Sequence, residues 1–353
     1  MKICVYGAGV LGSLYAAKLQ QAGHDVSIVA RGKRYEALCR DGIVLINEAT
    51  GERSETAVTV LDALPPEAVF DVILVLVRKN QVHAVLPVLA ANRGTPSIVF
   101  MINNAAGPAE YIQAVGYSRV VLGFPGAGGA REGDVIHYQL AGEAQPTTLG
   151  EVHGRITPRL EAIGLALAGA GLPVAYQTQM DAWLKTHVAL VSPVANALYL
   201  AGGDNTRLAN TRDGLLLMVR AIREGFQVLD RLSIPVTPLR YRVLLALPEP
   251  LLVFVLHHAL KRESARLMLA RHANAARDEM RQIADEFRIL ARRSGLQTPA
   301  LDALYAYLNP EEPPMLEGSR TLPFDPRQTL GMLGVTLGVS LTTLMVLHFW
   351  RKK

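Results

Sequence analysis

The sequence predicts an α/β domain followed by an all-α domain, and three observations support this fold class. Short apolar segments alternate with helical patterns up to about residue 176. Three closely spaced glycines follow the first of these segments, where a strand would turn into a helix. From about residue 177 the strand pattern disappears and long helical patterns replace it. We therefore divide the chain of 353 residues into domains 1–176 and 177–312, a proline-rich linker 313–329 and an apolar segment 330–350.

The first element is a buried strand over Met1–Tyr6, followed by a glycine turn, a helix and a second strand over Asp25–Ala30. Gly7, Gly9 and Gly12 have the G-x-G-x-x-G spacing that is typical of a Rossmann dinucleotide-binding unit. In such a unit the first glycine allows a tight turn, the second admits the pyrophosphate, and the third permits close helix packing. The alternative is the same strand-helix-strand unit without a ligand. We assign to cofactor binding the residues Gly7, Ala8, Gly9, Val10, Leu11 and Gly12.

The residues after the second strand indicate which dinucleotide is bound. An enzyme that uses NAD usually has an acidic residue here, which binds the ribose 2′-hydroxyl. This chain instead has Arg31, Lys33 and Arg34. Guanidinium groups bind phosphate in a bidentate manner, so we predict NADPH, with Arg31 as the main contact to the 2′-phosphate. Lys33 or Arg34 would support it, and the alternative is an ordinary exposed basic loop.

The remaining elements of the first domain follow from apolar runs. We predict a hairpin of residues 43–46 and 57–60, strands at 69–77, 97–102 and 119–123, and a loop at 123–129.

In the second domain the clearest helix covers residues 276–294. Its apolar residues recur at helical spacing, and Gly295 is a natural end for the helix. The active site would lie between this domain and the carboxyl ends of the strands. The apolar residues are Met280, Ile283, Phe287 and Leu290.

Composition argues against several classes of function. The net charge is +5 and aromatic residues are 6% of the chain, without the interleaved basic and aromatic pattern of nucleic-acid binding. The two cysteines, Cys4 and Cys39, do not form a disulfide framework. No group of His, Cys and Asp has the spacing of metal ligands, so we expect no catalytic metal. The first apolar run is too short for a signal peptide.

Several motifs, in this order, resemble the ketopantoate reductase (2-dehydropantoate 2-reductase) family over about residues 1–310. The resemblance implies a second domain of the 6-phosphogluconate-dehydrogenase-like, all-α kind. The motifs are G-A-G-V-L-G-S-L-Y-A-A-K-L, V-A-R-G-K-R-Y-E-A-L, R-K-N-Q-V, I-N-N-A-A-G, M-D-A-W-L-K and A-R-D-E-M.

The resemblance also implies roles for individual residues. Lys185 corresponds to the catalytic lysine of the family and Glu279 to its substrate-binding glutamate. Asn104 corresponds to an asparagine near cofactor and substrate. Arg78, or less favourably its neighbour Lys79, takes the place of a lysine near cofactor and substrate.

The chemistry is reasonable without the resemblance. Hydride transfer to a carbonyl carbon creates an alkoxide, which a lysine ammonium can stabilise and protonate. Glu279 could hold a substrate hydroxyl or orient Lys185, and Asn104 could hydrogen-bond cofactor and substrate. The alternative for Lys185 and Glu279 is that both are ordinary solvated helix residues.

This chain departs from the family pattern after the lysine. Ala189 replaces the first of two family asparagines, and Ser192 precedes the proline that normally follows the second. Ala105 replaces the glycine after Asn104. We name Ser192 and Asn196 as candidate substrate ligands and read His187 as a packing residue. Because the asparagines bind the family's small hydroxy-keto acid, these changes bear on the substrate.

The closing stretch predicts a membrane anchor. Residues 330–350 contain no Asp, Glu, Lys or Arg and would span about 30 Å as a helix. Trp350 suits the interface, whereas the basic end Arg351–Lys353 opposes the positive-inside tendency if the catalytic domains face the cytoplasm. The alternative is a buried C-terminal helix. Residues 243–260 form a second apolar stretch that could lie on the membrane surface.

Together these observations predict a membrane-anchored, NADPH-dependent reductase of a carbonyl compound, with Lys185 as general acid. We expect a small-molecule substrate, lipid contact through the C-terminal helix and no nucleic acid. A homodimer is compatible with the Gly334-x-x-x-Gly338 pattern. The alternatives are ketopantoate reductase proper, or a non-catalytic NADPH sensor or scaffold.

Overall fold

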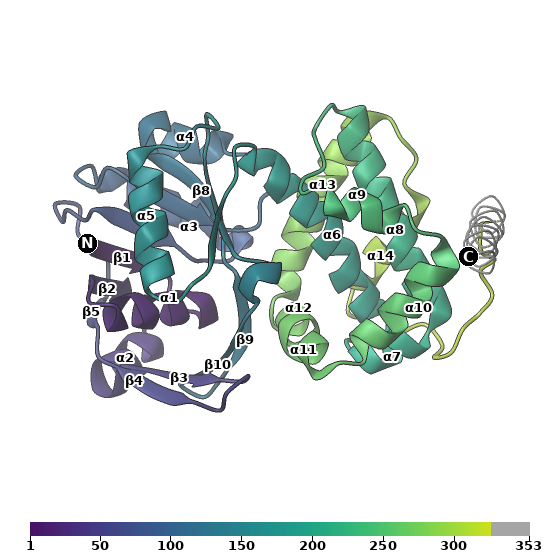
Figure 1. The fold of residues 1–353 in the computed structure, drawn as a ribbon, viewed down its shortest axis with the longest axis horizontal. Coiled ribbons are helices and arrows are strands. Elements are labelled where there is room, and N and C mark those ends of the chain that lie inside the picture. The colour runs from purple at the N-terminus through teal and green to yellow at the C-terminus, as the bar shows by residue number, and fades with distance from the viewer. Residues whose placement is uncertain (326–353) are drawn as a thin grey trace, which may run out of the picture.

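The computed structural model describes residues 1–325 and consists of an α/β domain and an all-helical domain (Figure 1). This architecture confirms the predicted fold class of the two domains. The predicted membrane helix at 330–350 lies outside the described residues. Within residues 1–325, no helix is both long enough and apolar enough to cross a membrane.

The first domain is built on an eight-stranded sheet. Six neighbouring strands are parallel, and the two at one edge run the opposite way. The central strands are buried on both faces, which is why their sequences are continuously apolar rather than alternating. The spatial order is β12 (Val174–Tyr176), β11 (Thr147–Glu151), β8 (Val120–Phe124), β7 (Ile98–Met101), β6 (Val72–Val75), β1 (Lys2–Tyr6), β2 (Asp25–Val29) and β5 (Thr59–Leu61).

Helices cover both faces of this sheet. One apolar core lies between the sheet and the first and last helices of the domain, and another lies under the third and fourth helices. The start of α6 also packs into the second of these cores, which joins the domains. The helices are α1 (Val10–Gln21), α2 (Lys33–Asp41), α3 (Val82–Ala91), α4 (Ala109–Val115) and α5 (Pro158–Gly169).

A second sheet corrects two predictions. Its order is β4 (Arg53–Thr56), β3 (Ile43–Asn47), β10 (Val135–Leu140) and β9 (Ala127–Glu132). The partner of β3 in the hairpin is therefore residues 53–56 rather than 57–60, and β5 joins the main sheet instead. The predicted loop at 123–129 ends early because Ala127 begins β9, whose small residues gave no strand signal.

The helical domain packs around α6, which contacts α8, α13 and α14. The predicted helix over 276–294 is confirmed as α13, and all four of its predicted apolar residues are buried. Gly295 ends it in the left-handed conformation with φ +70°. The helices are α6 (Met180–Leu200), α7 (Asn205–Asn210), α8 (Arg212–Arg231), α9 (Arg240–Leu245), α10 (Glu249–Leu260), α11 (Glu263–Ala265), α12 (Arg271–Ala275), α13 (Arg277–Ser294) and α14 (Pro299–Tyr305).

Candidate active site

The glycine turn has the geometry that a dinucleotide pyrophosphate requires. A β-carbon on Gly7 would lie 2.5 Å from Leu76 O, and one on Gly12 would lie 1.8 Å from Gly7 O. Both positions are therefore closed to any side chain. Gly9 is different, because no atom of residues 1–325 lies within 4 Å of its β-carbon position and the residue is exposed. Among the described residues no side chain caps the N-terminus of α1 at Gly9, which leaves its first N–H groups available to a phosphate.

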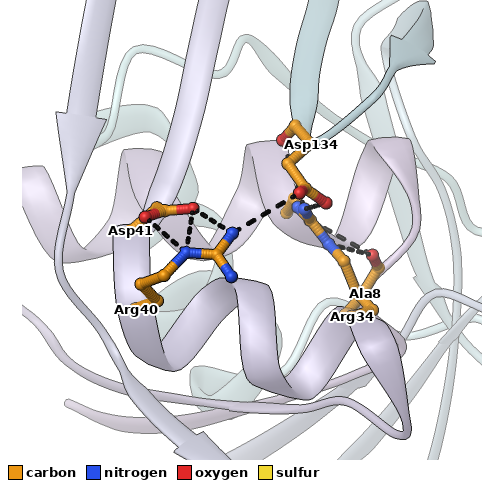
Figure 2. Close-up of polar contacts among 6 residues, drawn as sticks. Ala8, Arg34, Arg40, Asp41 and Asp134 are labelled. Atoms are coloured by element: carbon orange, nitrogen blue, oxygen red, sulfur yellow. Dashed lines mark hydrogen bonds and ion pairs between the residues drawn. The ribbon is translucent and has the colours of Figure 1, made fainter.

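Arg34 hydrogen-bonds to this turn at Ala8 and to Asp134, as Figure 2 shows. Its guanidinium donates to Ala8 O at 3.4 Å, to Ser13 Oγ at 3.1 Å and to Asp134 O at 3.2 Å. The Arg34 side chain is only 10% exposed, and this burial lowers its pKa. Arg40 pairs with Asp41 and lies 3.9 Å from Asp134. Arg34 is thus a structural residue of the turn rather than a free cation.

Arg31 and Lys33 remain available for a 2′-phosphate, because both are exposed beyond the end of β2. The charge of Arg31 interacts electrostatically with Tyr6. Burial raises the pKa of Tyr6, and the positive charge of Arg31 opposes that rise. The predicted main contact is therefore next to the carboxyl ends of β1 and β2.

Lys185 lies on α6, buried and paired with an acid. Its ammonium forms an ion pair with Asp181, one helical turn earlier, and its side chain is 10% exposed. A β-carbon on Gly107 would lie 3.5 Å from both Lys185 Nζ and Asp181 Oδ1. The loop after β7 therefore covers the ammonium. Asp181 Oδ1 is buried and has no hydrogen-bond partner among the described residues.

Asn104 shapes that covering loop. Its side-chain amide donates to Gly107 O at 2.9 Å, and its carbonyl accepts from Gly107 N at 3.0 Å. Both polar ends of the side chain are therefore used within the loop. Gly107 has φ +88°, a conformation that favours glycine. Asn104 therefore shapes the loop so that Gly107 lies against Lys185, while its own amide is bonded within the loop.

Glu279 reaches the other end of the same loop. This carboxylate is 5% exposed in the first turn of α13 and accepts from Asn103 Nδ2 at 3.2 Å and from Lys79 N at 3.4 Å. Asn103 Oδ1 is buried without a partner among the described residues. Lys185 and Glu279 therefore both lie against the loop that follows β7.

Lys79 and Arg78 stabilise the junction. Arg78 donates to Asp278 at 3.0 Å and to Ala275 O at 2.6 Å, which joins the domains. Lys79 Nζ lies 2.5 Å from Glu110 and 3.4 Å from Glu286. Burial alone lowers the pKa of Lys79, but the neighbouring Tyr111 and the two carboxylates outweigh it and raise that pKa.

Glu286 completes the support of the loop. Its Oε2 accepts from the backbone N–H groups of Ala105 and Ala106, at 3.1 and 3.2 Å. Since Glu286 also pairs with Lys79, one carboxylate of α13 joins the loops after β6 and β7. Sequence reasoning missed Glu286, Asp181 and Asn103. The i, i+4 spacing of Asp181 and Lys185 on a helix predicts their ion pair. No local pattern in the sequence predicts the role of Asn103.

The later residues of α6 lie away from Lys185. Ser192 and Asn196 are seven and eleven positions further, which is about 10 and 16 Å along the helix axis. Both are buried, and Asn196 Oδ1 has no partner among the described residues. Ala189 packs against α8, because a β-carbon on Gly225 would lie 3.2 Å from that of Ala189. A small acid bound at Lys185 would not span the distance to Asn196.

His187 faces a different direction and forms an aromatic cluster between the domains. Its ring stacks on Trp183 at 5.3 Å and contacts Phe124 at 4.1 Å. Burial, aided by the charge of His272, lowers the pKa of His187 to about 4. This neutral, stacked imidazole agrees with its interpretation as a packing residue. Within residues 1–325, no group of three or more His, Cys, Asp or Glu could hold a metal ion.

Known proteins of similar sequence agree on one family. The family model described as "Ketopantoate reductase PanE/ApbA" matches residues 3–154. A 2-dehydropantoate 2-reductase of Archaeoglobus fulgidus is 30% identical over 236 residues, which cover 66% of this chain and 75% of that protein. One of Mesorhizobium japonicum is 29% identical over 211 residues, which cover 52% of this chain and 63% of that protein.

Solved structures share the fold. A 2-dehydropantoate 2-reductase of Geobacter metallireducens superposes with a TM-score of 0.72 at 18% identity, over 87% of this chain and 99% of that one. The structure of D-mandelate dehydrogenase with NADH and anilino(oxo)acetate superposes with a TM-score of 0.70 at 16% identity, over 87% of this chain and 97% of that one. At these identities the structures establish only the fold. The sequence match to the archaeal protein goes further, and the chain therefore belongs to the ketopantoate reductase family of oxidoreductases.

Proposed function

We propose that this chain is an NADPH-dependent reductase that converts the carbonyl of a small 2-keto acid or related ketone into an alcohol, with Lys185 as general acid. The observation that carries the proposal is the buried Lys185 ammonium, held by Asp181 and covered by Gly107. A cation in a partly dry site stabilises a developing alkoxide far better than one in water. NADPH supplies the hydride for the carbonyl carbon when it is bound.

The roles of the other residues follow from their positions. Lys185 would donate one proton to the carbonyl oxygen as it becomes an alkoxide, and would then recover a proton from solvent. The Asp181 side chain is 45% exposed and so connects Lys185 to water. Glu279 and Asn103 would orient the substrate, since Asn103 Oδ1 has a free acceptor position among the described residues. Arg31 and the open Gly9 position support NADPH as the cofactor.

Ketopantoate is the first substrate to test, because the relatives of similar sequence are named 2-dehydropantoate 2-reductase. We expect the full chain in detergent to oxidise NADPH when ketopantoate is added. The Lys185→Ala variant should lower kcat by about 10²–10⁴-fold, the usual contribution of a positioned general acid. Arg293→Ala, which removes an exposed cation of the same domain, is the matched control.

Three outcomes separate the proposals. Turnover by Lys185→Ala close to that of the unchanged protein would refute the general-acid role. No turnover of ketopantoate, with other 2-keto acids reduced, would keep the reductase and change the substrate. Tight NADPH binding without turnover of any carbonyl compound would favour the non-catalytic sensor instead.

We also propose that the catalytic domains face the cytoplasm, where NADPH is available, and that residues 330–350 anchor the chain in a membrane. The support is the length of this uncharged stretch, which matches the hydrocarbon thickness. Carbonate extraction of membranes from cells that produce the full chain is the test. Release of the protein into the supernatant would contradict the anchor.

A further inference from the structure

Two consecutive helices of the second domain, α9 and α10, carry exposed apolar side chains. Six large apolar side chains between residues 239 and 255 are 36–67% exposed. Single exposed apolar residues are ordinary, but six within one short stretch of chain make that stretch a candidate interaction site. We call these side chains together the α9–α10 face, and they are Leu239, Val243, Leu244, Leu251, Phe254 and Val255.

The sequence of α10 is unusual for a helix on a protein surface. Residues 250–260 contain no charged residue, although one side of the helix is exposed. Leu252 and Leu260 face the core of the domain, being 2% and 3% exposed. The outer side presents Leu251, Phe254 and Val255, which are spaced i, i+3, i+4. A helix that is apolar on both sides needs an apolar partner on each.

Basic residues border this face. Lys261 and Arg262 follow α10 directly and are both exposed. His258, also exposed, lies against Phe254 with ring centroids 4.5 Å apart. In α9, Arg242 pairs with Asp230. An apolar helical face with cations at its edge is typical of a helix that lies in the interface of a membrane with anionic lipids.

The path of the chain leads to the same place. The C-terminal segment bends around the helical domain and passes α10, as Figure 1 shows in yellow. Asp325 N donates to Glu249, the first residue of α10, at 2.8 Å, and Pro323 O accepts from Arg220 at 2.7 Å. The 28 residues that follow, 326–353, therefore start at one end of the exposed face. They include the uncharged stretch 330–350.

We propose that the α9–α10 face binds the surface of a lipid bilayer that carries anionic headgroups. The face and the uncharged stretch after it would then meet one apolar medium on the same side of the molecule. This arrangement keeps the cofactor domain away from the lipid, since Figure 1 shows that domain at the opposite end from α10. The proposal does not depend on which substrate the enzyme reduces.

The test places an environment-sensitive fluorophore on the face of the full chain. Phe254→Cys is labelled in a Cys39→Ser background, since Cys4 is buried and Cys39 is the exposed cysteine. Leu165→Cys is the matched control, because Leu165 is 72% exposed on α5 of the other domain. Detergent is removed in the presence of vesicles of phosphatidylcholine and phosphatidylglycerol, with or without a doxyl-labelled lipid that quenches fluorescence on contact.

We expect the label at position 254 to shift to the blue and to be quenched by the doxyl lipid, while the label at position 165 does neither. Quenching reports lipid contact at the face itself, so simple tethering by the C-terminal residues would not produce it. Val255→Cys gives an independent position if Phe254→Cys unfolds, as judged by circular dichroism.

Other results would overturn the proposal. A label that is blue-shifted before vesicles are added, and that doxyl lipid does not quench, would mean that the chain's own C-terminal residues or a second copy covers the face. A label at position 254 whose emission does not shift and is not quenched after vesicles are added would mean that the α9–α10 face binds no lipid. Equal quenching in vesicles of phosphatidylcholine alone, unchanged by Lys261→Glu with Arg262→Glu, would refute the anionic headgroup.

Discussion

Three basic residues that follow one another closely in the sequence have different roles in the fold. The Arg34 side chain lies against the glycine turn and donates hydrogen bonds to Ala8, Ser13 and Asp134. Arg31 and Lys33 remain exposed at the end of β2. A guanidinium whose donors are already used has little left for a phosphate. The 2′-phosphate role that we propose therefore belongs to Arg31.

This division of roles predicts different effects on two cofactors. Arg31→Ala should weaken NADPH about 10–100-fold and leave NADH nearly unchanged, because one charge-assisted hydrogen bond contributes about 1.5–3 kcal/mol. Arg34→Ala should weaken both cofactors alike, since it loosens the turn that binds the part they share. Isothermal titration with each cofactor measures this, and Arg40→Ala is the control. An Arg34→Ala variant that lost NADPH affinity alone would reverse the assignment.

At the scale of elements, the β1–α1 unit shows why a glycine can serve either the fold or the ligand. Gly12 leaves no room for a β-carbon, whereas Gly9 leaves space that nothing in the described chain occupies. Gly12 is required by packing. A glycine at position 9 is required only when a ligand approaches the backbone closely.

The two glycines should therefore respond differently to substitution. Gly12→Ala should lower the free energy of unfolding by about 3 kcal/mol or more, because backbone atoms must move. Gly9→Ala should change it by less than about 1 kcal/mol, as its φ of −75° suits any residue. It should nevertheless reduce NADPH affinity. Urea unfolding and NADPH titration of both variants test this, and unimpaired NADPH binding by Gly9→Ala would contradict the cofactor site.

The contact between α6 and β8 predicts a pH dependence of stability. His187 has its pKa lowered from 6.5 to about 4 in the folded protein, so only the unfolded chain gains a proton in that interval. This part of the stability is complete above pH 6.5 and is lost as the pH falls toward about 4. Between about pH 7.5 and pH 5 it should amount to about 1–2 kcal/mol.

His187→Phe is the variant that isolates this effect, because it keeps an aromatic ring against Trp183. Urea unfolding at both pH values should show a smaller acid loss of stability in the variant than in the unchanged protein. An equal loss in the two proteins would mean that other groups cause it.

At the scale of the whole molecule, exposed ion pairs join the domains around the site. Arg78 binds Asp278 of α13, and Arg271 of α12 binds Glu132 of β9 at 3.0 Å. Such pairs contribute little stability individually, but both join the two domains that border the candidate active site. Arg78 is also the residue that the family resemblance associates with the cofactor.

A double-mutant cycle distinguishes these two roles. If Arg78 acts through Asp278, then Arg78→Met and Asp278→Asn should have similar effects on the KM of the keto acid. Their effects should also be non-additive, and each should lower the free energy of unfolding by less than about 1 kcal/mol. If Arg78 instead binds the cofactor, only Arg78→Met would weaken NADPH. Steady-state kinetics and NADPH titration of the three variants decide between them.

Local sequence determined much of this protein. The glycine spacing predicts the turn at Gly7–Gly12, because strand, turn and helix follow one another within one short segment. The apolar period and Gly295 predict α13 for the same reason. The predicted pair Lys185 and Glu279 came from motif resemblance, and the fold brings both to one loop.

Tertiary structure alone decided the rest, because the contacts join residues far apart in the chain. Asn103, rather than Asn104, meets Glu279 across 176 positions, and no local pattern distinguishes the two asparagines. The second strand of the hairpin and the loop at 123–129 were predicted wrongly, since β5 joins the main sheet and β9 pairs with β10. The local sequence thus determined the elements and the kind of chemistry. Only the packing of two domains decided which polar atoms face one another, because that depends on distances that no local spacing encodes.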